Sequence, residues 1–184
     1  MSPRSRRATV VLAIATLTGG LTACGSDDKP DATDFKACAL VDTTTASTAL
    51  GAASVTSDDE SKDMNGPESN ILSCRYTPKG EGPALVFLAN QASSSSKATS
   101  DIESTQQSCA DAQPLAVDGV TGFVCSTGDL GGGPQVYATW DTYVVHAALT
   151  QSRTGPDAQK ATAGLTSVIE QIHDNLTATA FTGS

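Results

Sequence analysis

Four cysteines are the residues best suited to covalent chemistry within the folded part of the chain: Cys38, Cys74, Cys109 and Cys125. No two of them form a CxxC pair and neither histidine lies beside one, so the ligand spacings of zinc sites are missing. An even number of cysteines in an exported domain instead indicates disulfides. Three connectivities are possible, and we favour the sequential one, Cys38–Cys74 with Cys109–Cys125. Each bond would contribute roughly 3–4 kcal/mol in the chain-entropy treatment.

The fifth cysteine, Cys24, follows an N-terminal segment that is typical of an export signal. Residues 1–7 carry three arginines and no acid, and residues 8–22 form an apolar run of 15 residues. That run is shorter than the roughly 20 residues needed to span a bilayer. The sequence LTAC at 21–24 matches a lipobox and resembles bacterial lipoprotein signals, in which the cysteine takes a diacylglyceryl group and becomes the first residue after cleavage.

We therefore predict a signal peptide at 1–23, lipidation of Cys24 and a location on the outer face of the cell membrane. The alternative is an ordinary signal with a chance cysteine. The arginine pair at 6–7 leaves both the general secretory and the twin-arginine export routes open.

Residues 24–36 are predicted to be the lipidated cysteine and a flexible tether, because GSDDKPDATDFK at 25–36 is polar and holds four aspartates. Fully extended, this tether would reach at most about 40 Å. Residues 37–184 suit a single extracytoplasmic domain in length.

The charge of the mature chain excludes one class of partner. Without residues 1–23 the chain has 8 basic and 20 acidic side chains, a formal charge of −12. Nucleic acids favour Lys and Arg, so we expect no nucleic-acid binding. We expect a monomer whose contacts are the membrane, through the lipid on Cys24, and an unidentified envelope ligand or protein.

Helical and strand patterns alternate along residues 37–184. A short helix would have Asp42 or Thr43 as its N-cap and end at Gly51, and a polar acidic loop would follow at 54–69. Strand patterns occupy 70–76, 83–90, 121–127, 134–140 and 142–150, with a helix at about 96–109 and an amphipathic helix over 155–178. This order predicts an α+β fold, in which an antiparallel sheet of about five strands packs against two or three helices and disulfides staple the domain.

Several of these features together resemble a family of actinomycete envelope lipoproteins without an assigned activity. They are the lipobox and tether, the opening ACALVDTTTASTALGAA, the sequence SCRY and the cysteine pair before the last helix. The family usually carries an aromatic residue, often Trp, two residues after the second cysteine, where this chain has Tyr76. The resemblance implies no catalytic residues.

No constellation of catalytic residues stands out in the sequence. GxSxG, HExxH and the P-loop pattern are absent. The sequence DMNG invites a calcium interpretation, but aligning it as an EF-hand loop puts Ser61 and Leu72 at the first and twelfth ligand positions, where both are wrong. Ser94 and Lys97 form an SxxK pair, and RTG at 153–155 resembles a KTG triad, but no SxN completes that active site.

The two histidines remain. His146 shares a strand face with Val144 and Ala148 and could project into a groove, and His173 lies near the C-terminus of the last helix.

We therefore predict no catalytic residue, metal or cofactor. The leading hypothesis is an exported, lipid-anchored envelope protein that binds a ligand or protein without catalysis. The alternatives are an unrecognised envelope hydrolase, with His146 as its candidate residue, and a structural or regulatory lipoprotein that acts on a membrane partner.

Overall fold

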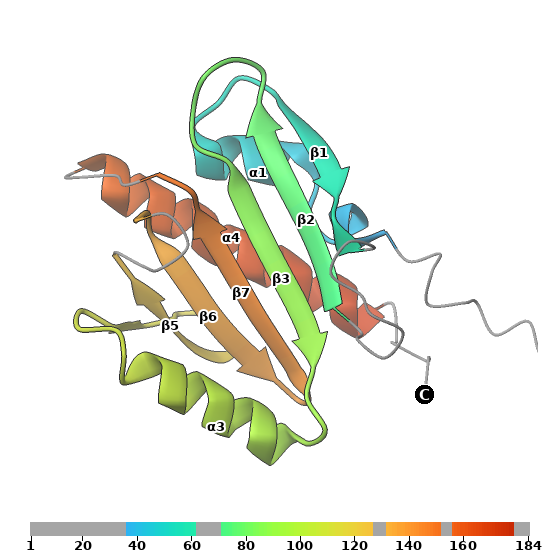
Figure 1. The fold of residues 1–184 in the computed structure, drawn as a ribbon, viewed down its shortest axis with the longest axis vertical. Helices are drawn as coiled ribbons and strands as arrows, with labels where there is room; N and C mark the ends of the chain where they lie inside the picture. Colours follow the sequence, from blue (N-terminus) through green and yellow to red (C-terminus); the bar gives the residue numbers. More distant parts are fainter. Residues whose placement is uncertain (1–35, 62–70, 127–131, 152–155, 179–184) are drawn as a thin grey trace, which may run out of the picture.

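The computed structural model describes residues 36–61, 71–126, 132–151 and 156–178, which form an α+β fold around one antiparallel sheet (Figure 1). The order of the elements is η2 (Ala37–Ala39), α1 (Thr43–Leu50), β1 (Val55–Asp59), β2 (Ile71–Pro78), β3 (Leu85–Gln91), α3 (Ser95–Gln106), β4 (Gln113–Pro114), β5 (Thr121–Cys125), β6 (Gln135–Trp140), β7 (Tyr143–Leu149) and α4 (Pro156–Ala178). Within these ranges the sheet has seven strands in the order β1-β2-β3-β7-β6-β5-β4. The predicted fold class is confirmed, but the prediction of about five strands is too low.

The two additional strands lie at the edges of the sheet. The prediction of a polar loop is wrong over 55–59, where β1 pairs with β2, while residues 62–69 of that loop lie outside the described ranges. Of the residues in β1 only Val55 is buried, and β4 has two exposed residues. Edge strands need little apolar pattern because one face and one edge meet solvent, and charged side chains there discourage pairing with other chains. The sequence of β1, VTSDD, therefore carries almost no strand signal.

The helices α1 and α4 pack on one face of the sheet, which we call the first face. The helix α3 packs on the opposite face, which we call the second face. On the first face α4 contacts β6, β7 and α1, while α3 contacts β5, β6 and β7 from the opposite side. The main core lies between the first face and the helices. Its apolar side chains come mostly from alternate strand residues and from α4: Leu72, Tyr76, Leu85, Phe87, Val136, Trp140, Val145, Leu149, Leu165, Ile169 and Ile172.

The helices begin and end largely where the sequence predicts. Asp42 caps α1 by accepting a hydrogen bond from the Thr45 N–H (2.7 Å), and Gly51 ends the helix at φ 65°. The predicted α4 stripe is buried throughout: Ala161, Leu165, Val168, Ile172 and Leu176. Gly164 lets α4 approach α1 closely, because a Cβ at this position would lie 2.5 Å from the Cα of Ala49.

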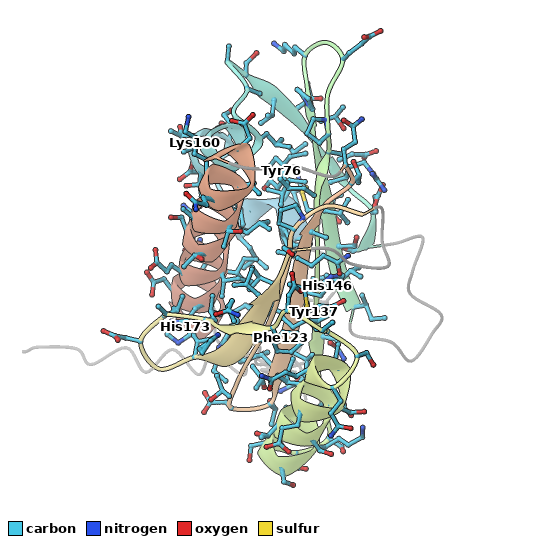
Figure 2. The ribbon with its side chains drawn as sticks, turned by 90° about the vertical axis from the view of Figure 1, so that its left-hand side faces the viewer. Tyr76, Phe123, Tyr137, His146, Lys160 and His173 are labelled. Carbon is cyan, nitrogen blue, oxygen red and sulfur yellow. A yellow bond between two sulfur atoms is a disulfide. The ribbon has the colours of Figure 1, made fainter. Side chains whose placement is uncertain are left out.

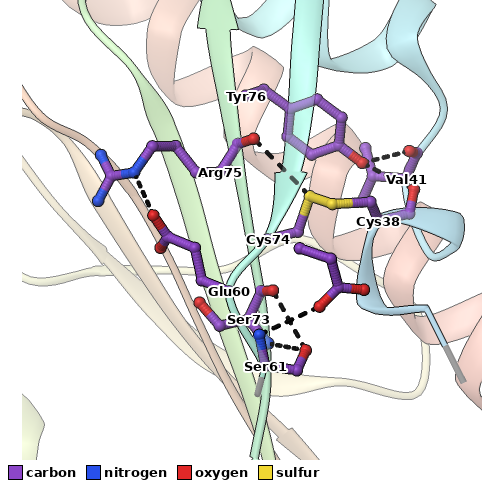
Figure 3. The surroundings of a disulfide bond; sticks show 9 residues. Cys38, Val41, Glu60, Ser61, Ser73, Cys74, Arg75 and Tyr76 are labelled. Atoms are coloured by element: carbon purple, nitrogen blue, oxygen red, sulfur yellow. Dashed lines mark hydrogen bonds and ion pairs between the residues drawn. A yellow bond between two sulfur atoms is a disulfide. The ribbon is translucent and has the colours of Figure 1, made fainter. Parts of the chain in front are cut away.

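The start of the domain is attached to β2 by one disulfide and by hydrogen bonds from one tyrosine hydroxyl (Figure 3). Cys38 bonds to Cys74, with 5.2 Å between the Cα atoms. The hydroxyl of the fully buried Tyr76 lies 3.0 Å from the Cys38 carbonyl oxygen and 2.5 Å from the Val41 carbonyl oxygen, and it donates its proton to this pair. The Cys109–Cys125 disulfide is also formed, so the favoured sequential pairing is the one observed.

Burial is the main cause that raises the pKa of Tyr76 to about 12, and the nearby Asp42 and Asp59 carboxylates add to it. Because this pKa is higher folded than unfolded, Tyr76 contributes stability that is fully present below about pH 10 and declines as the pH rises toward 12.

We predict that Tyr76→Phe lowers the free energy of unfolding at pH 7 by about 1–2 kcal/mol, because two buried carbonyl oxygens lose their donor. In denaturant titrations, the gap between wild type and variant should narrow as the pH rises from 10 to 12. Tyr143→Phe is the control, since Tyr143 is a half-buried tyrosine on β7. A gap that stays constant across this window would contradict the assignment.

Candidate functional site

A row of side chains crosses the second face of the sheet from β3 to β5. The register places Leu88 opposite His146, His146 opposite Tyr137, and Tyr137 opposite Phe123. Because paired residues of neighbouring strands project from the same face, these four side chains are adjacent. We call them the second-face row.

The aromatic members of the second-face row are stacked ring on ring. The ring centroids of Tyr137 and His146 lie 4.2 Å apart at an interplanar angle of 6°, and those of Phe123 and Tyr137 lie 5.1 Å apart at 18°. Phe123 is fully buried, whereas Leu88, His146 and Tyr137 are half-buried. Figure 2 shows this order, with Phe123 nearest to α3, Tyr137 next and His146 farthest from the helix.

A buried glutamine joins the polar ends of this row. Oε1 of Gln135 accepts a hydrogen bond from the Tyr137 hydroxyl (2.7 Å) and lies 2.9 Å from Nε2 of His146. In this amide orientation the imidazole is the tautomer with its proton on Nε2, because a carbonyl oxygen can only accept. Gln135 is fully buried, and within the described residues its Nε2 has no hydrogen-bond partner. Among the described residues this amide nitrogen is therefore a buried donor without a hydrogen-bond partner.

His146 is neutral at physiological pH. Burial lowers its pKa to about 4, because the charged imidazolium loses solvation. A base with so low a pKa is weak at neutral pH, and the described polar partner of the ring is an amide, not the carboxylate that orients the histidine of a catalytic triad. The arrangement is suited to hydrogen bonding and stacking more than to proton transfer.

The other candidates from the sequence lie away from this row. His173 lies on α4 on the first face, where it meets the Trp140 ring edge-on with 5.0 Å between centroids. Ser94 caps α3 by accepting a hydrogen bond from the Lys97 N–H (3.2 Å), and Lys97 pairs with Asp101. The SxxK pattern thus serves a helix start. RTG at 153–155 lies outside the described residues, as do Cys24, the signal peptide and the tether up to residue 35.

The one cluster of potential metal ligands in the described part of the chain includes two cysteines that are not free to bind a metal. Cys109, Asp111 and Cys125 bring their ligand atoms within 4.8 Å of one another, but the two sulfurs are bonded to each other. Ser61, considered above as a calcium position, is buried, and its hydroxyl lies 3.0 Å from the Ser73 amide nitrogen and 3.3 Å from the Ser73 carbonyl oxygen. Its role there is to join the end of β1 to β2.

The sequence located His146 on the correct strand face but carried no indication of its partners. Gln135, Tyr137 and Phe123 were not among the predicted site residues. Period two on the strands at 134–140 and 142–150 placed Gln135 and Tyr137 on one face, and only the sheet register shows that this face meets His146. The signal in the sequence that could have indicated this site is the alternation of polar residues, such as Gln135 and Thr139, with the core residues of the same strand.

Comparison with known proteins identifies no relative: no protein-family model matches the chain, and no curated protein sequence matches it. None of the helices in the described ranges is both long enough and apolar enough to cross a membrane.

We predict an acid-dependent loss of stability from His146. Its folded pKa lies below its unfolded value of about 6.5, so its contribution is present above that pH and is lost as the pH falls toward 4. Between pH 7 and pH 4.5, wild type should lose roughly 1–3 kcal/mol more unfolding free energy than His146→Gln in urea titrations. His173→Gln serves as the matched control for the loss of a histidine. Equal slopes for wild type and His146→Gln would show that the ring is not buried as described.

Proposed function

We propose that this chain is an exported, lipid-anchored cell-envelope protein whose domain binds a ligand or a protein partner through its second face, without catalysis. The observation that carries this proposal is the second-face row with Gln135. It combines stacked rings, two of them half-buried, with a neutral histidine, which the buried Gln135 holds in place by a hydrogen bond. These groups recognise a partner by shape and hydrogen bonds.

The second face has room for a partner beyond α3. The main contacts of α3 are with β5, β6 and β7, and none of the helices in the described ranges lies over the near side of β2 and β3 in Figure 1. The half-buried Val86 and Leu88 of β3 lie on this uncovered side. Farther along, Arg75 pairs with Glu60, with 2.7 Å between Nε and Oε1. An apolar centre with a polar rim is the usual anatomy of a protein-binding surface.

The anchor is proposed from the sequence, and the fold is compatible with it. Lipid on Cys24 and a tether over 25–36 would lead directly into η2, which the Cys38–Cys74 disulfide attaches to the sheet. Force applied to the tether would therefore be transmitted through this disulfide to β2. The likeness to actinomycete envelope lipoproteins supports the same proposal through LTAC and through SCRY, whose tyrosine fixes the start of the domain.

The envelope hydrolase is the competing function, and His146 is its candidate residue. The geometry described above gives this histidine an amide partner and a low pKa, which favours the binding proposal. The regulatory lipoprotein is a special case of protein binding, in which the partner is a membrane protein.

We predict that protein expressed in an actinomycete host starts at Cys24, carries added lipid mass and gains four hydrogens on reduction, one pair for each disulfide. Cys24→Ala should move the protein from the membrane fraction to the soluble fraction or the medium, because the thioether that carries the two acyl chains of the diacylglyceryl group cannot form. Intact mass and fractionation measure both effects. Cys24→Ala protein that stays membrane-bound would contradict the anchor without touching the binding proposal.

We predict that a photo-crosslinking amino acid at Leu88 forms a defined adduct in intact cells, whereas the same group at Glu170 forms none. Leu88 lies in the second-face row, and Glu170 is an exposed residue of α4 on the opposite side of the molecule. Adduct yield is read by mass spectrometry. Equal yields at both positions would argue against a second-face partner. Hydrolysis of an envelope peptide, ester or phosphate substrate that disappears in His146→Gln would replace the proposal with the hydrolase.

A further inference from the structure

The helix α3 buries few of its side chains against the sheet. Of its 12 residues only Ala98 and Ile102 are buried. Together Ile102, Phe123 and Cys125 form a second core of three buried residues, separate from the main core. Only a small apolar surface therefore holds α3 against the second face.

A disulfide closes the connection between α3 and the sheet. Cys109 lies three residues after the end of α3 and bonds to Cys125, the last residue of β5. Cys109 is half-buried and sits between exposed residues, so a reductant can reach its sulfur, whereas Cys125 is 3% exposed. Asp111 adds a second connection across the same gap by accepting a hydrogen bond from the Ser126 hydroxyl.

The strands beneath α3 also bury side chains on the opposite face of the sheet. Strands β5, β6 and β7 bury Val124, Val136, Ala138, Val145 and Ala147 in the main core on the first face. Their backbone ladders continue to β3 and β2. Segments with few buried contacts open locally at lower free energy than the rest of a domain. The helix could therefore leave the second face while the sheet, α1 and α4 stay in place.

We propose that α3 is a detachable cover held by the Cys109–Cys125 disulfide, and that reduction of this bond uncovers the Phe123 end of the second-face row. The reductant is an envelope dithiol protein or a small thiol. Its thiolate attacks Sγ of Cys109, and Cys125 leaves as a thiolate that takes a proton. A second thiol of the reductant then displaces Cys109, so the reductant ends as a disulfide and the two cysteines end as thiols.

Opening of α3 enlarges the aromatic surface, because Phe123 is fully buried and Tyr137 half-buried while the helix is in place. The carboxylate of Asp111 lies 3.5 Å from Sγ of Cys109. In the reduced protein this carboxylate can accept a hydrogen bond from the Cys109 thiol. This proposal concerns only the exposure of the second-face row. It does not depend on the binding function proposed above.

The test is amide hydrogen exchange on the purified full-length protein, compared between wild type and Cys109→Ala/Cys125→Ala. Exchange across 95–112 should rise at least about tenfold in the double variant, while β2, β3 and α4 keep the rates of wild type. Diethylpyrocarbonate labelling of His146, next to the uncovered rings, should rise as well. The matched control is Cys38→Ala/Cys74→Ala, which removes the other disulfide and should leave exchange of α3 unchanged relative to the sheet.

A second measurement keeps the proposal testable if the double variant does not fold. Wild type is titrated with dithiothreitol, free thiols are alkylated, and peptide mapping shows which disulfide is open in each exchanging species. The proposal is supported if α3 exchanges fast only in species in which Cys109 and Cys125 are reduced, while the sheet in those species stays protected from exchange. Unchanged exchange of α3, or a rise that α3 shares equally with α4, overturns it. Neither measurement depends on binding of a partner. A negative result would therefore overturn the proposal for α3 without testing the proposed binding function.

Discussion

The packing of Tyr76 beneath the start of the domain is the contact on which the first-face layer depends. Its ring is fully buried, and its hydroxyl meets the carbonyl oxygens of Cys38 and Val41 at a point where the chain makes the irregular turn of η2. These carbonyl groups have no strand partner, and a buried carbonyl without a donor costs free energy comparable to a lost hydrogen bond. The phenol supplies that donor from β2. Two residues before it in the strand, Cys74 holds the same segment covalently through Cys38.

This attachment sets the position of α1 and, through α1, of α4. Asp42 follows directly after the turn and caps α1 through the Thr45 amide, and its other carboxylate oxygen accepts a hydrogen bond from the Gln171 side chain on α4 (2.6 Å). From the same helix, Asn175 donates to the Leu40 carbonyl oxygen (2.7 Å). The turn, the cap and the last helix are thus joined by polar contacts more than a hundred residues apart in sequence. Gly164 then allows the close approach of the two helices that these contacts require.

The sequence predicts the parts of the fold whose signals are local. Asp42, Gly51 and the apolar stripe of α4 each follow from capping, backbone freedom or period, and all three are observed. β1 could not be predicted in this way, because an edge strand with one buried residue owes its existence to β2 and not to its own side chains. Cys109 falls outside α3 for a similar reason. The helix ends at Gln106, and the disulfide to β5, a partner distant in sequence, fixes the position of the chain beyond the helix.

The candidate site was less accessible to prediction than the fold. Period two places His146 on the face opposite the core, which is correct, but the identity of its neighbours depends on which strand lies beside β7. β6 comes directly before β7, so Tyr137 meets His146 within a local hairpin once its register is known. β3 comes from a hairpin far earlier in the chain, so Leu88 meets His146 from a sequence distance that no local pattern encodes. Cross-strand contacts of this kind are fixed only when the register of the whole sheet is fixed.

The register of the sheet also determines what the row can do. Each strand that contributes a row residue buries its alternate residues in the main core: Phe87 and Ala89 flank Leu88, Val145 and Ala147 flank His146, and Val136 and Ala138 flank Tyr137. The main core therefore fixes the backbone beneath the row, and the stacked rings keep their spacing whatever covers them. A surface held in this way loses little entropy when a partner binds, which is the condition for affinity from a modest contact area. Catalysis by His146 would instead require a ring free to accept and release protons near neutral pH. Burial beside Gln135 works against that, because the same physical setting that weakens the histidine as a base keeps its ring fixed and neutral.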